Sequence, residues 1–127
     1  MKHVLLVEDD PDVRALLTEI LDEAGFGVTD VRTFADARHL VDGEGIDLVV
    51  TDVVLPDGRG TELAQYAERR GLRTLVLTGN VDRMQELALR DREYLAKPFR
   101  GRDLLERVHA CLGSADGGGD RGAATRR

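Results

Sequence analysis

The chain has 127 residues, 42% of them hydrophobic, which fits one domain with a single core. Its formal net charge is −6 and its basic residues form no run, so this balance argues against binding to nucleic acid or to an anionic membrane. A single cysteine excludes an internal disulfide, and no apolar run near the N-terminus suits a signal peptide or a membrane span, so we expect a cytoplasmic protein.

The first half of the chain predicts three strands and two helices. Residues 3–7 (HVLLV) form the first strand, and Asp10 caps a helix that stops at Gly25. Apolar residues recur there at the spacing of one helix face: Val13, Leu16, Leu17, Ile20, Leu21 and Ala24. A strand over 27–31 and a short helix capped by Thr33 follow, with Phe34, Ala37, Leu40 and Val41 inward. The continuous apolar run 48–51 then suits a parallel strand covered on both faces.

The second half continues the alternation. A loop, LPDGRG, leads to a helix over 61–70, and RTLVLTG forms a fourth strand. A helix over 81–89 precedes a short strand, YLA, and a last helix whose inner face carries Leu104, Leu105, Val108 and Leu112. Five βα units predict an α/β fold with a parallel sheet, right-handed crossovers and helices on both faces. The Gly-rich residues 114–127 lack apolar periodicity, and we expect a disordered tail after a domain of residues 1–113.

Polar side chains follow the strands of this predicted sheet. Glu8, Asp9 and Asp10 come after the first strand and Asp52 after the third. Thr78 ends the fourth strand and Lys97 follows the fifth. Ligands of open parallel sheets bind at the carboxyl ends of the strands, so we expect these groups to meet there. Several carboxylates at one edge need a cation, and Mg²⁺ suits carboxylates with waters and phosphate oxygens.

This set of groups suits phosphoryl transfer. A transferring phosphoryl group needs a nucleophile in line, and a metal, an ammonium and a hydroxyl on its oxygens. Asp52 is the one acid of the set that stands alone, so it is the predicted nucleophile and would form an acyl phosphate. Glu8 and Asp9 would hold the metal.

The motifs VEDD, TDVVLP, LVLTG and YLAKPF, in this order, resemble the receiver domain of two-component response regulators, over residues 1 to about 113. The resemblance implies a flavodoxin-like, doubly wound, five-stranded parallel sheet of order 2-1-3-4-5. It also implies that Asp52 accepts phosphate, in a Mg²⁺-dependent step, from a sensor histidine kinase or a histidine phosphotransfer protein. Such a domain is not an enzyme for other substrates and catalyses only its own phosphorylation and dephosphorylation.

The resemblance assigns a role to each matching position. Asp9 matches a direct metal ligand, Glu8 its partner acid, and Val54 the residue whose backbone carbonyl completes the metal shell. Thr78 matches the switch hydroxyl, Lys97 the phosphate-binding lysine, Pro98 a cis proline, and Tyr94 the aromatic that rotates when the hydroxyl moves.

Several of these residues also have simpler explanations. Asp10 is well explained as a helix cap alone. Thr78 is also an ordinary strand residue, Lys97 an ordinary surface lysine, and Tyr94 a plausible core residue. Cys111 is expected to be a small buried hydrophobe.

The sequence departs from the family pattern in two places. In this family, two positions tune the lifetime of the phosphate, and they correspond to Val54 and Asn80 here. Because the Val54 side chain has no polar group to orient an attacking water, we predict slow to moderate self-dephosphorylation. The segment between Thr78 and Lys97 is shorter than usual, with RDRE in place of Gly-Ala. The helix over 81–89 should therefore be short or displaced, which puts the family's usual output face in doubt.

Three other functions compete with this one. A haloacid-dehalogenase-type phosphatase needs a second acid two residues after the nucleophile, where this chain has Val54. A receiver-like interaction module would work without phosphorylation, and the chain would also fit the receiver of a hybrid histidine kinase. Residues 114–127 do not have the length or the apolar pattern of an output domain, so we expect output through contacts with an unidentified protein target.

Overall fold

A computed structural model describes residues 1–79 and 92–113. The helix predicted over 81–89, the position Asn80 and the tail predicted over 114–127 lie outside the described residues. Within the described ranges, no helix is long and apolar enough to cross a membrane.

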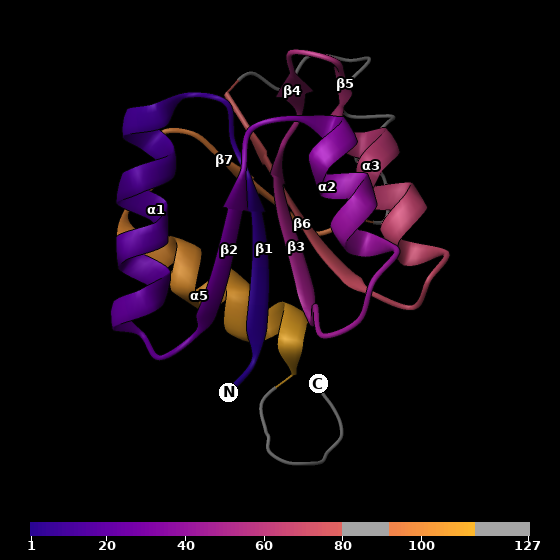
Figure 1. Cartoon of the computed structure of the whole chain (residues 1–127). Helices are drawn as coiled ribbons and strands as arrows, with labels where there is room; N and C mark the ends of the chain where they lie inside the picture. The colour runs from indigo at the N-terminus through magenta and orange to yellow at the C-terminus, as the bar shows by residue number, and fades with distance from the viewer. Residues whose placement is uncertain (80–91, 114–127) are drawn as a thin grey trace.

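A five-stranded parallel sheet forms the centre of the molecule (Figure 1). Its strands are β1 (His3–Val7), β2 (Gly27–Val31), β3 (Leu48–Asp52), β6 (Arg73–Thr78) and β7 (Tyr94–Ala96). The strand order β2-β1-β3-β6-β7 is the predicted order 2-1-3-4-5, because β4 and β5 belong to a separate small hairpin. The order reverses between β1 and β3, which is where a doubly wound sheet binds its ligand.

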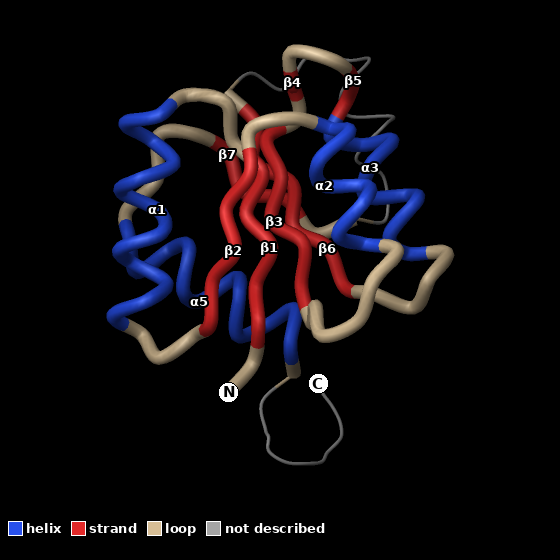
Figure 2. The backbone as a smooth tube through the Cα atoms, in the orientation of Figure 1, coloured by secondary structure: helices blue, strands red, loops and turns tan. Residues whose placement is uncertain are grey.

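Helices cover both faces of the sheet, so the fold has three layers (Figure 2). Helices α1 (Pro11–Glu23) and α5 (Gly101–Leu112) lie on one face, and α2 (Phe34–Val41) and α3 (Gly60–Glu68) lie on the other. The fold class expected from the βα alternation is therefore confirmed.

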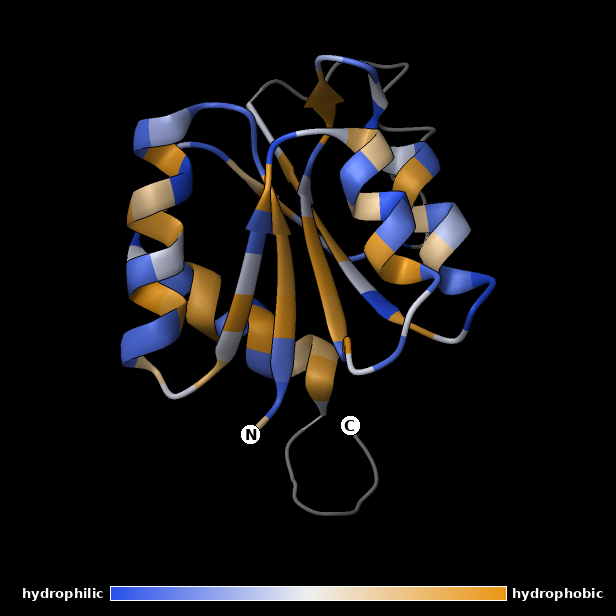
Figure 3. Ribbon diagram, in the orientation of Figure 1, coloured by the Kyte–Doolittle hydropathy of each residue, from blue (hydrophilic) through white to orange (hydrophobic). Residues whose placement is uncertain are grey.

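The central strands β1 and β3 are mostly apolar because both of their faces are buried (Figure 3). In β1, Val4 and Leu6 pack toward α1 and α5, whereas Leu5 and Val7 pack toward α2 and α3. All four side chains are fully buried. Because successive side chains of a strand point to opposite faces of the sheet, β1 contributes residues to the hydrophobic core on each side.

The helix boundaries follow the predicted caps. The Asp10 carboxylate accepts hydrogen bonds from the backbone N–H groups of Asp12 (2.9 Å) and Val13 (3.2 Å). The Thr33 hydroxyl accepts one from Asp36 N–H (3.1 Å) at the start of α2. These side chains satisfy N–H groups that the first helical turn leaves without partners.

Two local predictions were wrong. Leu16 and Ala24 were expected to face the core, but Leu16 is 56% exposed and Ala24 is exposed as well, because α1 rests on the sheet along a narrower stripe that buries Leu17 and Leu21. The LPDGRG segment was expected to be a loop but forms an antiparallel hairpin, β4 (Val54–Leu55) and β5 (Gly58–Arg59). Leu55 is buried in the core under α2 and α3, and this burial holds the segment in an ordered path.

Candidate functional site

The predicted site residues lie at the carboxyl ends of the central strands. Glu8 directly follows β1, Asp52 ends β3, and Lys97 directly follows β7. The strand registers place Val7 beside Thr51, and Thr78 beside Ala96, so the strand ends are level with one another. Parallel pairing therefore brings residues 8, 52 and 97 to one edge of the sheet.

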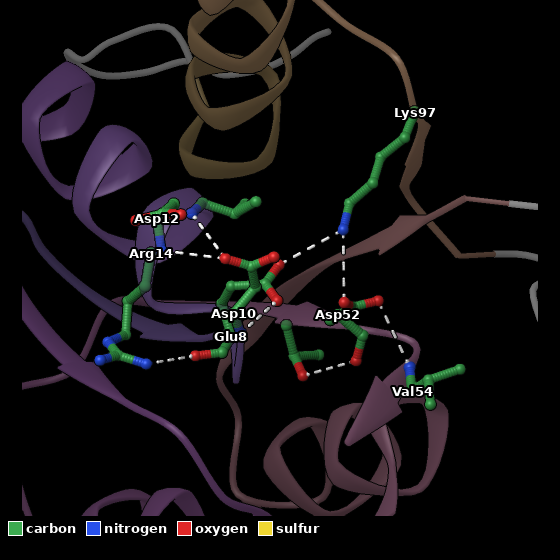
Figure 4. A network of polar contacts seen from close by, with 9 residues as sticks. Glu8, Asp10, Asp12, Arg14, Asp52, Val54 and Lys97 are labelled. Carbon is green, nitrogen blue, oxygen red and sulfur yellow. Dashed lines mark hydrogen bonds and ion pairs between the residues drawn. The ribbon is translucent and has the colours of Figure 1, made fainter. Parts of the chain in front are cut away.

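Lys97 bridges the two acids (Figure 4). Its Nζ atom lies 3.3 Å from Glu8 Oε1 and 3.3 Å from Asp52 Oδ2. The Asp52 side chain is 13% exposed, so its carboxylate is largely shielded but still reachable from solvent. An acid that is accessible and held beside an ammonium group is suited to act as a nucleophile toward a phosphoryl group.

Glu8 is the most deeply buried charged residue of the cluster, with 1% of its side chain exposed. Burial raises the pKa of its carboxyl group above 4.5, and the negative charge of Asp52 acts in the same direction. Two contacts oppose this shift, namely the Asp10 backbone N–H (3.2 Å from Oε2) and the charge of Lys97. A second positive charge, in addition to that of Lys97, would therefore further stabilise the ionised form of this buried carboxylate.

Asp9 completes a group of three acids. Carboxylate oxygens of Glu8, Asp9 and Asp52 all lie within 4.8 Å of one another, and the Asp9 side chain is exposed. Lys97 offsets one of these three charges, so the cluster fits a divalent cation both by its charge and by its oxygen donors. The donor set contains no His or Cys, which makes it more typical of Mg²⁺ than of Zn²⁺.

Lys97 stays charged in this setting. Burial lowers the pKa of its ammonium group, but the adjacent charges of Asp52 and Glu8 outweigh burial and raise the pKa above 10.5. Its backbone is fixed as well, because Lys97 N–H donates to the Thr78 carbonyl oxygen (2.7 Å). The predicted cis peptide bond between Lys97 and Pro98 is confirmed.

The other predicted residues lie on β4, β6 and β7. Thr78 is fully buried at the end of β6, next to β7. The Val54 side chain is 65% exposed, and its backbone N–H donates to Asp52 Oδ1 (3.4 Å). Tyr94 begins β7 and is 37% exposed, so the alternative explanation that Tyr94 is a core residue is wrong.

Two residues that support the site were missed by the sequence analysis. Arg14, one turn into α1, donates to the Glu8 carbonyl oxygen (3.0 Å) and pairs with Asp30 on β2 (3.2 Å). Gly60 begins α3 so close to β3 that a Cβ atom there would overlap the Asp52 carbonyl oxygen. A glycine at the start of a predicted helix was the available signal for Gly60, whereas no sequence feature distinguished Arg14.

An open pocket of about 400 Å³ lies elsewhere, at the opposite edge of the sheet, where residues such as Glu68, Arg73 and Arg92 line it. Its charged groups are largely paired with each other: Arg92 binds Glu68 (3.0 Å), and Thr74 donates to the same carboxylate (2.7 Å). This pocket contains none of the predicted site residues.

Comparison with known proteins agrees with the geometry. The family model for the response regulator receiver domain matches residues 4–109, a range that contains Glu8, Asp52 and Lys97. The chain belongs to the response regulator receiver domain family. It is therefore a signalling domain of two-component systems, which confirms the family and the flavodoxin-like sheet expected from the motifs.

Two curated relatives illustrate how receiver domains occur. The response regulator receiver protein CpdR of Brucella abortus is 37% identical over 120 residues, an alignment covering 88% of this chain and 98% of CpdR. The transcriptional regulatory protein CpxR of Escherichia coli is 34% identical, with 88% of this chain and 50% of CpxR covered. The chain thus spans nearly all of the first relative and about half the length of CpxR.

Solved receiver structures share the fold. A CheY-like receiver domain protein from Methanospirillum hungatei matches with a TM-score of 0.82 at 29% identity, covering 88% of this chain and 94% of that one. The response regulator TrrA of Thermotoga maritima, solved in complex with Mg²⁺ and BeF, matches with a TM-score of 0.78 at 29% identity. The match covers 88% of this chain and all of the TrrA chain.

Proposed function

We propose that this receiver domain is phosphorylated on Asp52 in a Mg²⁺-dependent step, with a sensor histidine kinase or a histidine phosphotransfer protein as donor. The observation that carries the proposal is the convergence of Asp52, Glu8 and Lys97 within 3.3 Å ion-pair contacts at the sheet edge, with Asp9 in the same cluster. Structural similarity to TrrA, whose Mg²⁺ and BeF complex is known, supports a metal and a phosphoryl group as ligands.

In this step an Asp52 carboxylate oxygen attacks the phosphorus of the donor's phosphohistidine. The new P–O bond forms as the P–N bond breaks, and the histidine nitrogen leaves with the electron pair. Glu8, Asp9, Asp52 and the Val54 carbonyl would hold Mg²⁺, which when bound offsets charge on the phosphoryl oxygens. The chain catalyses this transfer and the later hydrolysis only on itself.

Lys97 and Thr78 are assigned to the phosphoryl group. The ammonium of Lys97 already contacts Asp52 Oδ2, so it is placed to bind an oxygen of phosphate attached there. The Thr78 hydroxyl would bind a second oxygen, and Tyr94 would turn inward as Thr78 moves. The phosphate adds about −1.5 to −2 charges, enough to shift a small two-state equilibrium.

Output would pass through contact with an unidentified protein target, whether the domain acts alone or as the receiver of a hybrid kinase. The proposed donors and the buried free thiol of Cys111 suit a protein of the reducing cytoplasm. The expectation that the helix over 81–89, part of the family's usual output face, is short or displaced stays a prediction, because this segment lies outside the described residues.

The test is phosphorylation of the purified chain with a small phosphodonor, acetyl phosphate, with and without Mg²⁺. We expect one phosphoryl group per chain, dependent on Mg²⁺ and abolished in Asp52→Asn. The matched control is Asp10→Asn, which removes a neighbouring negative charge but keeps an oxygen that caps α1. Labelling of Asp52→Asn would contradict the choice of acceptor, and an unlabelled wild type would favour an interaction module that works without phosphorylation.

A further inference from the structure

The hairpin that follows Asp52 is fastened to a helix from another part of the chain. Asp57, in the turn between β4 and β5, accepts hydrogen bonds through both carboxylate oxygens. Phe34 N–H donates to Oδ1 (2.7 Å) and Ala35 N–H donates to Oδ2 (3.0 Å). These donors are the first two residues of α2, so Asp57 caps a helix that lies 22 residues before it in sequence.

An apolar contact reinforces this attachment. The Phe34 ring packs against Gly58 so closely that a Cβ atom on Gly58 would lie 2.8 Å from the ring. Leu55, from the first strand of the hairpin, is 5% exposed and belongs to the same core cluster as Ala37 and Val41 of α2. The hairpin therefore has a polar and an apolar attachment to one helix.

The other end of the hairpin is fixed beside the acceptor. Gly60 N–H donates to the Val53 carbonyl oxygen (2.8 Å), and Val53 N–H donates to the Leu77 carbonyl oxygen of β6 (2.9 Å). Between these anchors and Asp57 lies Val54, whose N–H points at Asp52 Oδ1. The backbone next to the acceptor is thus held from α3 and β6 on one side and from α2 on the other.

We propose that Asp57 is a positioning residue of the metal and phosphoacceptor site. By holding the hairpin on the N-terminus of α2, it keeps the backbone of Val54 in the orientation that the Asp52 carboxylate and the metal require. Metal and phosphoryl sites depend on such support, because small displacements of a ligand cost affinity and rate. This inference rests on the proposed function, since it concerns Mg²⁺ binding at the same site.

The experiment compares two variants that each remove a cap from the same helix. Asp57→Ala removes the cap that also holds the hairpin, whereas Thr33→Ala removes the hydroxyl that accepts from Asp36 N–H and leaves the hairpin attached. Mg²⁺ binding to the full chain is followed by calorimetry, and the unfolding free energy by urea titration. We expect Asp57→Ala to weaken Mg²⁺ binding by about tenfold, as is typical of residues that orient metal ligands, and Thr33→Ala to leave it unchanged.

A conservative variant separates positioning from general destabilisation. Asp57→Asn keeps one acceptor oxygen for α2 and should recover part of the lost affinity. Equal Mg²⁺ affinity in wild type and Asp57→Ala would overturn the inference, and so would equal weakening in Asp57→Ala and Thr33→Ala. Both of these results leave the proposed function intact, whereas a wild-type chain that does not bind Mg²⁺ would overturn the two together.

Discussion

Replacing Lys97 by methionine should destabilise the metal-free protein, because it removes the ammonium group that both Glu8 and Asp52 contact. Methionine is chosen because it is unbranched and fills a similar apolar volume without a charge. After the change, two carboxylates lie close together in a shielded site, with Asp9 beside them.

The size of the effect follows from the two contacts. At 3.3 Å each ion pair gives about 5 kcal/mol of gross attraction at an effective dielectric constant of about 20. Desolvation of the ions cancels much of this, and the Lys97 side chain is 29% exposed, so screening by water reduces it further. We expect a net loss of about 2 kcal/mol of unfolding free energy at pH 7, below the range for fully buried pairs.

The loss should depend on pH in a defined direction. Burial already raises the pKa of Glu8 above 4.5 in the folded protein, and removal of Lys97 raises it further. Between the unfolded and the folded pKa the native state binds more protons, so stability falls as the pH rises through that window. The variant and the wild type should therefore become more similar in stability as the pH falls and Glu8 takes up a proton, and they should diverge toward pH 7.

Urea unfolding followed by far-ultraviolet circular dichroism measures the effect, since the chain has no tryptophan to report by fluorescence. The control is the double variant Lys97→Met with Glu8→Gln, in which the buried charge is gone and the pH dependence should disappear. Equal stability of wild type and Lys97→Met at pH 7, at low ionic strength and without Mg²⁺, would refute the structural role assigned to the two ion pairs.

Three further predictions test other parts of the structure. Gly60→Ala should lower the unfolding free energy by about 2 kcal/mol, because the new methyl group forces α3 away from the Asp52 carbonyl, and an unchanged melting temperature would contradict that close approach. Burial raises the pKa of the Cys111 thiol to about 12, so the native protein should resist alkylation at pH 8 and react in urea; rapid native modification, followed by mass spectrometry, would show an accessible thiol. Thr78→Ala should keep Asp52 labelling by acetyl phosphate while the nuclear magnetic resonance shift changes of β7 and α5 on beryllofluoride binding shrink, and undiminished changes would exclude Thr78 as the coupling residue.

The sequence alone determined the order and kind of the main elements. Continuous apolar strands, amphipathic helices and caps at Asp10 and Thr33 are local patterns, each specified within about ten residues. Because parallel strands end at one edge, the polar residues after them also predicted which side chains meet. Glu8, Asp52 and Lys97, which lie at the ends of three of these strands, form ion pairs as this pattern predicts.

Only the tertiary structure decided how these side chains are held. The contacts of Asp57 with α2 and of Arg14 with Asp30 join segments that carry no pattern linking them. The exposure of Leu16 depends on where α1 rests on the sheet. The regular structure of the β4–β5 hairpin depends on the burial of Leu55 against α2 and α3. Local periodicity specifies which face of an element is apolar, whereas packing distances between elements set the contacts that orient a site.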